Sequence, residues 1–319
     1  MKNRPFHELL KSLSSLTFAQ SKQVQEHIIH QCKIESLEDI IGKVDSCPHC
    51  HSSELYKWGV RSNLQRYRCK SCHKTFNALS ATSLARLRYK EMWLDYTQDL
   101  IKGESIRASA EHCHVDKNTT FRWRHKMLQI PAISKAKEVH GIVEFDETYF
   151  LESQKGNHPL SRAARKRGGS ATQRGISSEQ IAVLIVRDRN GNTTDAILEQ
   201  SNQYTIAKVM LPLLDKDVLL CSDKKPSYKA FANNNDLTLE TINVSKKEHT
   251  RGIVHVQNVN AYDSRLKEWM KHFHGVATCH LESYLGWMRI LDGMKNISVK
   301  GFLALIGKRL DYLQPLTPT

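Results

Sequence analysis

Apolar residues near the start of the chain recur every three or four positions, which is the period of an amphipathic helix. Leu9, Leu13, Val24 and Ile28 lie on this predicted face. The pattern predicts an N-terminal helical segment at 1–45 that serves packing or dimerisation. The sequence leaves the choice between these two roles open.

The pattern changes after residue 138, where shorter apolar runs predict strands. The predicted order is strand, strand, strand, helix and strand, at 141–150, 180–187, 192–198, 204–214 and 218–223. Asn190-Gly191 separates the second and third strands and is a hairpin signal. This order is typical of a ribonuclease H-like fold, in which the first strand is central and the last lies beside it. We therefore predict an RNase H-like α/β/α domain with a mixed sheet at 138–319.

Two cysteine pairs, Cys47–Cys50 and Cys69–Cys72, have the spacing of a four-thiolate zinc site. The 18 residues between the pairs suffice for a hairpin that returns the second turn beside the first. A disulfide or two unrelated pairs are the alternatives. We predict a zinc ribbon at 46–78 with a structural role, because four protein ligands leave zinc no open position.

Helical periodicity returns at 85–130 and ends at Pro131. Ser105 is placed to cap one helix, and Asp116 a second. Two helices joined by so short a turn predict a helix-turn-helix, whose second helix enters the DNA major groove. The side chains predicted to contact DNA there are Lys117, Asn118, Arg122 and Arg124. The whole chain is thus predicted to be a multidomain α+β protein.

Carboxylates occur inside the apolar strands, where burial is costly unless a cation or metal compensates it. Asp146 lies in the first strand, and Asp223 ends the last. A third position comes from a predicted helix near 255–269, on which Asn260, Asp263 and Lys267 share a face. Asn260 offers an amide oxygen to Mg²⁺. Taken alone, this helix also matches an ordinary solvated face.

The net charge of +14 favours a polyanionic partner. Part of this charge lies in a predicted loop at 153–179, where Arg165, Lys166 and Arg167 are candidate DNA contacts. The N-terminus lacks the apolar core of a signal peptide, and no apolar run is long enough to cross a membrane. We therefore expect a cytoplasmic protein that has no membrane partner.

The chain resembles bacterial insertion-sequence transposases of the DDE type, especially those with an N-terminal zinc ribbon and an asparagine as third residue. The resemblance covers nearly the whole chain. It rests on the cysteine pairs, Glu144-Phe-Asp-Glu-Thr-Tyr, Cys221-Ser-Asp and the stretch from His255 to Trp269.

This resemblance implies that Asp146, Asp223 and Asn260 bind the catalytic Mg²⁺ or Mn²⁺, and that Lys267 is the basic residue of the site. Asp263 stands where a histidine or another non-acidic residue is expected, and it is a rival third ligand. The implied reaction is two-metal phosphoryl transfer on DNA, at the terminal inverted repeats and at target DNA. The working complex is then at least a dimer, and the bacterial protein is associated with the nucleoid through DNA.

Two other functions remain open from the sequence. One is a catalytically inactive DNA-binding regulator, which Asn260 in place of the usual glutamate favours. The other is an RNase H-like nuclease, which cuts DNA without joining strands.

Overall fold

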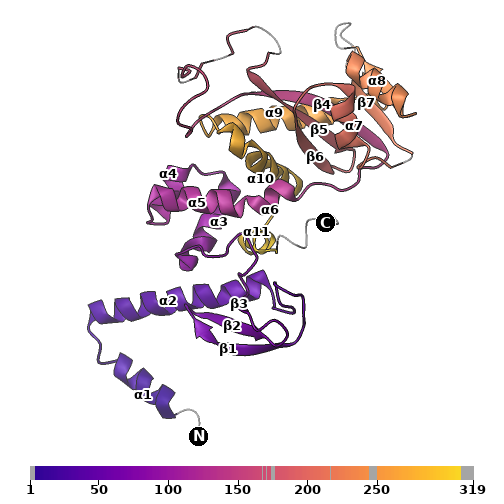
Figure 1. Cartoon of the computed structure of the whole chain (residues 1–319). Coiled ribbons are helices and arrows are strands. Elements are labelled where there is room, and N and C mark those ends of the chain that lie inside the picture. Colours follow the sequence, from indigo (N-terminus) through magenta and orange to yellow (C-terminus); the bar gives the residue numbers. More distant parts are fainter. Residues whose placement is uncertain are drawn as a thin grey trace. The chain divides into compact units, whose positions relative to one another are not determined.

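The chain forms two compact units, shown in Figure 1. The first consists of Met1–Trp123 with Ser298–Thr319, and the second of Arg124–Ile297. The computed structural model describes residues 4–166, 168–169, 171–173, 177–215, 217–243 and 250–309.

The first unit begins with two helices, α1 (Arg4–Leu13) and α2 (Phe18–Ile41). The helical segment predicted at 1–45 is therefore interrupted. The interruption has a local cause, because Thr17 caps α2. Its hydroxyl accepts from the backbone N–H of Gln20, and the Gln20 side chain accepts in return from the backbone of Thr17. This reciprocal capping box fixes the start of α2.

A small antiparallel sheet follows in the order β1-β2-β3. Its strands are β1 (Leu55–Arg61), β2 (Leu64–Cys69) and β3 (Thr75–Asn77). The first two form the hairpin predicted between the cysteine pairs, whereas the third is too short to give a periodic pattern. The sheet has a small core in which Tyr67 stacks on Phe76 with ring centroids 6.0 Å apart.

Helices complete the first unit: η1 (Lys90–Met92), α3 (Trp93–Lys102), α4 (Ile106–His112), the start of α5 (Lys117–Met127), and α11 (Val299–Ile306). Tyr96 and Trp123 meet edge to face at 5.1 Å. The Ser83 hydroxyl donates to the carbonyl of Ile306 at 3.0 Å. The sequence assigned α11 to the domain at 138–319, but its buried residues pack within the first unit.

The second unit contains a five-stranded mixed sheet in the order β6-β5-β4-β7-β8. Its strands are β4 (Ile142–Leu151), β5 (Gln180–Asp188), β6 (Thr193–Leu198), β7 (Leu219–Asp223) and β8 (Thr238–Ile242). β4 is central and antiparallel to β5, and β7 lies beside it in parallel. The mixed α+β class and the predicted strand order are confirmed.

Helices cover both faces of this sheet (Figure 1). On one face, Phe145 of β4 packs in a core with residues of α7 (Gln203–Met210) and α8 (Pro226–Asn234). On the other, Ile185 packs with residues of α9 (Gln257–Lys271) and α10 (Leu281–Gly293). The remaining short elements are α6 (Gln129–Ile133), β9 (Thr250–Arg251), β10 (Val254–His255) and η3 (Thr278–His280).

No described helix is both long and apolar enough to span a lipid bilayer.

Candidate active site

Asp146 and Asp223 lie on adjacent parallel strands at the centre of the large sheet. Glu144 of β4 is paired with Cys221 of β7, so continuing the register by two residues places Asp146 opposite Asp223. Because side chains alternate along a strand, both aspartates face the same side of the sheet as Cys221. Cys221 packs with the core beneath α9, so the two carboxylates face this helix.

The surroundings of the two aspartates disfavour their charged forms. Burial is the main cause that raises the pKa of Asp146 to about 6, and the carboxylates of Asp223, Asp263 and Glu147 raise it further. A hydrogen bond from the backbone N–H of Glu147 to Asp146, 2.8 Å long, opposes this effect. Burial also raises the pKa of Asp223. Raised carboxyl pKa values beside like charges are typical of a site that gains from a bound cation.

Asn260 and Asp263 lie one turn apart on α9 but differ in exposure. The Asn260 side chain is exposed to solvent. Asp263 is half-buried, and its Oδ2 accepts from Lys267 Nζ at 2.7 Å. Its other oxygen, Oδ1, is buried without a hydrogen-bond partner, as is Oδ1 of Asp223. Both oxygens therefore lack the compensation that a buried carboxylate normally has.

The three carboxylates of Asp146, Asp223 and Asp263 do not all lie within 4.8 Å of one another. Oxygen ligands with uncompensated atoms nevertheless match the preference of Mg²⁺ and Mn²⁺. The donor set fits a divalent metal.

Glu144, which the sequence analysis did not assign to the site, fixes α9 against β4. Its buried carboxylate accepts from the backbone N–H groups of Asn258 at 2.8 Å and Val259 at 3.0 Å. Arg189 lies 3.1 Å away and compensates the charge. A carboxylate at a helix N-terminus satisfies its free N–H groups and complements its dipole. The signal for this role was present in the sequence, as an acidic residue within an apolar strand.

Glu147, on the opposite face of β4, holds the end of β7 in a similar way. Its Oε2 accepts from Lys225 Nζ at 2.7 Å and from the Tyr149 hydroxyl at 2.5 Å. Although burial opposes ionisation, the hydrogen bond from Lys225 helps to lower the net pKa of Glu147. Lys225 follows Asp223 by two residues, so this ion pair ties the end of β7 to β4.

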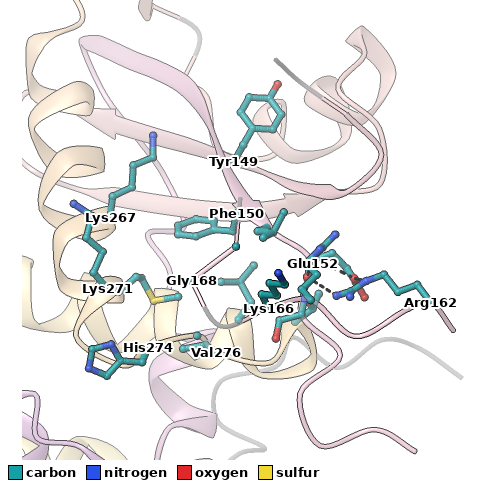
Figure 2. Close-up of a pocket in the computed structure, with 18 residues that line it drawn as sticks. Tyr149, Phe150, Glu152, Arg162, Lys166, Gly168, Lys267, Lys271, His274 and Val276 are labelled. Carbon is teal, nitrogen blue, oxygen red and sulfur yellow. Dashed lines mark hydrogen bonds and ion pairs between the residues drawn. The ribbon is translucent and has the colours of Figure 1, made fainter. Parts of the chain in front are cut away.

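A cavity of about 770 Å³ adjoins the C-terminal end of β4. Lys267 and Lys271 reach it from α9, and the segment with Arg162 and Lys166 lines it across from that helix (Figure 2). Phe150 contributes apolar surface. The site therefore borders a partly apolar hollow with cationic side chains.

The three loop cations predicted to contact DNA have different surroundings. Arg165 is paired with Glu179, with 3.5 Å between Nη2 and Oε1, whereas Lys166 is exposed. Arg167 lies outside the described residues. Arg162, also in this segment, donates to Glu152 at 2.9 Å.

The four cysteines of the first unit converge on one point. All four sulfur atoms lie within 4.8 Å of one another, and two pairs, Cys47–Cys72 and Cys50–Cys69, are 3.6 and 3.5 Å apart. Tetrahedral zinc with Zn–S bonds of about 2.3 Å requires sulfurs roughly 3.8 Å apart. The backbone N–H of Cys72 donates to the Cys69 sulfur and is the main cause that lowers the pKa of Cys69 to about 6. The donors fit zinc.

Helices α4 and α5 occupy the positions predicted for a helix-turn-helix. Ser105 accepts from the N–H of Ala108, and Asp116 from that of Asn118, as expected of capping residues. Three of the predicted DNA-contacting side chains, Lys117, Asn118 and Arg122, are exposed.

Arg124 lies elsewhere, in the interior of the second unit. It is fully buried, with its guanidinium 4.9 Å from the Trp287 ring centroid. Because a cation over an indole face is stabilised in place, Arg124 is a packing residue, and we remove it from the predicted DNA contacts.

Residues 138–289 match the family model of the ISXO2-like transposase domain. A further relative is an "uncharacterized protein in transposable element ISH50" from Halobacterium salinarum. It is 25% identical over 245 residues, which cover 75% of this chain and 82% of the relative. Both matches support the prediction that the chain is an insertion-sequence transposase.

Among solved structures, the chain is similar to the Mos1 strand transfer complex, at 13% identity and a TM-score of 0.26. The match covers 67% of this chain and 78% of the Mos1 chain. A pre-cleavage Mos1 transpososome gives 12% identity and a TM-score of 0.20, with the same coverage. TM-scores this low do not establish a shared fold.

Proposed function

We propose that this transposase binds the terminal inverted repeats of its insertion sequence and catalyses metal-dependent strand cleavage and strand transfer. The observation that carries this proposal is the pair of aspartates, Asp146 and Asp223, on adjacent central strands beneath α9 in a transposase domain. The fold we propose for this domain is RNase H-like, since the strand order and helix layers agree with that architecture.

In the proposed site, Asp146 and Asp223 hold divalent metal together with Asn260 or Asp263. Bound Mg²⁺ or Mn²⁺ supplies activation of the attacking hydroxyl and stabilisation of the leaving oxygen. The protein's part is to fix the ligands, and the Glu144 contacts to the start of α9 do this for the third position.

The third ligand is the least determined member of the site. The resemblance to transposases with a variant third residue supports Asn260, whose side chain is exposed. The unpartnered Oδ1 supports Asp263. Asp263 also pairs with Lys267, so its second role is to position this lysine.

Basic groups next to the carboxylates are suited to DNA phosphates. Lys267 borders the cavity beside the aspartates, and Lys271 and Lys166 extend the cationic lining. Neutralising phosphate charge supports binding of any DNA sequence and weakens with salt. These residues are therefore proposed to hold the DNA strand at the site of cleavage.

Sequence recognition is proposed to come from the first unit. A zinc ion held by Cys47, Cys50, Cys69 and Cys72 stabilises the ribbon, and the exposed residues Lys117, Asn118 and Arg122 contact the repeat. Because two ends of the element must be brought together, the working complex is at least a dimer.

The test uses the full chain and a labelled duplex that carries the element's own terminal repeat. Strand cleavage and joining are measured with and without Mg²⁺ or Mn²⁺. We expect Asp146→Ala and Asp223→Ala to lower cleavage by roughly a thousandfold or more while binding is retained. Asp217→Ala, which removes an exposed aspartate of the same unit, is the matched control.

Three results would contradict the proposal. Repeat-specific binding without cleavage under either metal indicates the catalytically inactive regulator. Cleavage without joining, directed by DNA structure rather than by the repeat, indicates a nuclease. Equal loss of activity in the Asp217→Ala control shows that the aspartate effects are not specific.

A further inference from the structure

A second cluster of metal-ligand side chains lies in the first unit, away from the ribbon cysteines in sequence. It consists of Asp99, His112 and Cys113, whose ligand atoms all lie within 4.8 Å of one another. Asp99 belongs to the last turn of α3, while His112 ends α4 and Cys113 caps it. The short connection between the two helices keeps them close, and the end of α4 meets the last turn of α3 at these residues.

Burial distinguishes this cluster from a surface group. The side chain of Asp99 is only 3% exposed, and Cys113 is fully buried. His112 is the accessible member, with 53% of its side chain exposed. A metal ion bound here would thus have protein on one side and solvent on the other.

The carboxylate of Asp99 is incompletely compensated. Its Oδ1 lies 2.8 Å from Nδ1 of His112, but its buried Oδ2 has no hydrogen-bond partner. A buried carboxylate with an unpartnered oxygen costs free energy of folding, because the water it has lost is not replaced. The neighbouring Cys113 sulfur supplies a third donor atom.

We propose that Asp99, His112 and Cys113 bind a zinc ion, independently of the ribbon cysteines. Thiolate, imidazole and carboxylate are ligands that zinc accepts together, whereas Mg²⁺ and Ca²⁺ take oxygen ligands only. Three protein ligands leave a fourth position for water on the exposed side of His112.

Binding is a substitution of protons by metal. Zinc takes the place of the hydrogen between His112 Nδ1 and Asp99 Oδ1, so that the neutral imidazole binds through Nδ1 and keeps its one hydrogen on Nε2. The thiol of Cys113 loses its proton to solvent as the Zn–S bond forms, and no oxidant or reductant is involved.

The site lies next to the elements proposed to read DNA. The ion would join the end of α3 to the end of α4, a few residues before α5 begins at Lys117. A bond of this kind would hold the turn ahead of α5 in one conformation. Its role is structural and does not depend on the proposed catalysis.

The experiment measures zinc bound to purified full-length protein after equilibration with zinc chloride and removal of free metal. We expect about two zinc ions per chain in the wild type, one in each site. Cys113→Ser, His112→Gln and Asp99→Asn should each lower this to about one. Cys32→Ser, which changes an exposed cysteine of α2, should leave the value unchanged.

Cobalt substitution gives a second readout, because it reports thiolate ligation directly. Cys113→Ser should remove one sulfur-to-cobalt charge-transfer contribution and retain that of the ribbon. Of the three variants, His112→Gln is the least affected by misfolding, since this side chain is half exposed and its replacement disturbs little packing.

Two outcomes overturn the proposal. The first is about one zinc per chain in the wild type with no loss in the Cys113 and His112 variants. The second is a further zinc that persists in all three variants, which identifies an adventitious ion only.

Discussion

The two units hold their candidate metal ligands by different means. The ribbon cysteines lie in turns and at the end of β2 in a three-stranded sheet, where Val44, Leu55, Tyr67 and Phe76 form a small apolar core. The aspartates instead lie on the central strands of a five-stranded sheet with a core on each face. We therefore expect the ribbon to need a bound metal to fold, whereas packing and buried ion pairs hold the framework of the candidate active site before any metal binds.

The largest expected effect is that of removing zinc from the ribbon. Structural zinc contributes roughly 10 kcal/mol or more to such small domains, so chelation should unfold β1, β2 and β3. The large sheet should remain folded. Hydrogen exchange measures both at once: amides of β2 should lose protection and amides of β5 should keep it. Equal loss of amide protection in β2 and β5 would contradict the expectation that only the ribbon needs metal to fold. Cys69→Ser should have the same effect as the chelator.

The next effect tests the ion pairs that hold the catalytic framework. Glu144→Ala leaves Arg189 and the start of α9 without their buried partner and should cost about 3–5 kcal/mol of unfolding free energy. We expect the melting temperature of the second unit to fall by about 10 °C.

A matched control for Glu144 exists in the same unit. Glu240 pairs with Arg251 at 2.6 Å, but both side chains are exposed. Glu240→Ala should therefore cost less than about 1 kcal/mol. Similar shifts in the two variants would show that α9 is not held by Glu144.

A smaller and opposite effect is expected at Asp146. Its pKa is about 6 in the folded protein against 3.8 ordinarily, so the folded state binds more protons between these values. The contribution of Asp146 to stability therefore falls as pH rises through this range. Without added Mg²⁺, Asp146→Asn should stabilise the protein at pH 8 by up to about 3 kcal/mol, and by little at pH 3.

Thermal unfolding across this pH range measures the difference. Adding Mg²⁺ at pH 8 should raise the stability of the wild type and leave Asp146→Asn unaffected, because the metal then compensates the carboxylates. A variant that is less stable than the wild type at pH 8 would contradict the assignment of Asp146 as an uncompensated buried acid.

The sequence was most informative where spacing alone determines geometry. Cys47 and Cys50 are close in sequence, and the strands that carry Asp146 and Asp223 have clear apolar runs. Contacts between elements far apart in the sequence could not be predicted in this way. Glu144 accepts from residues more than 110 positions away, and no local pattern specifies that pairing. The burial of Arg124 was missed because a basic residue on a helix ordinarily faces solvent.

The smallest effect on stability is expected at Lys267, where the effect on function should be clear. Lys267 is 47% exposed and pairs with Asp263 within α9, so its replacement by alanine should change stability by less than about 1 kcal/mol.

Lys271 is a matched control one turn later, since it lines the same cavity and also pairs with an acidic residue of α9, Glu268. Only Lys267 is paired with a candidate metal ligand. We therefore expect Lys267→Ala to lower metal-dependent cleavage at least tenfold, while Lys271→Ala mainly weakens DNA binding and its dependence on salt. Rates measured at saturating DNA separate the two roles. Equal cleavage rates for both variants under that condition would show that Lys267 only contacts DNA phosphates, as Lys271 does, and would remove it from the catalytic set.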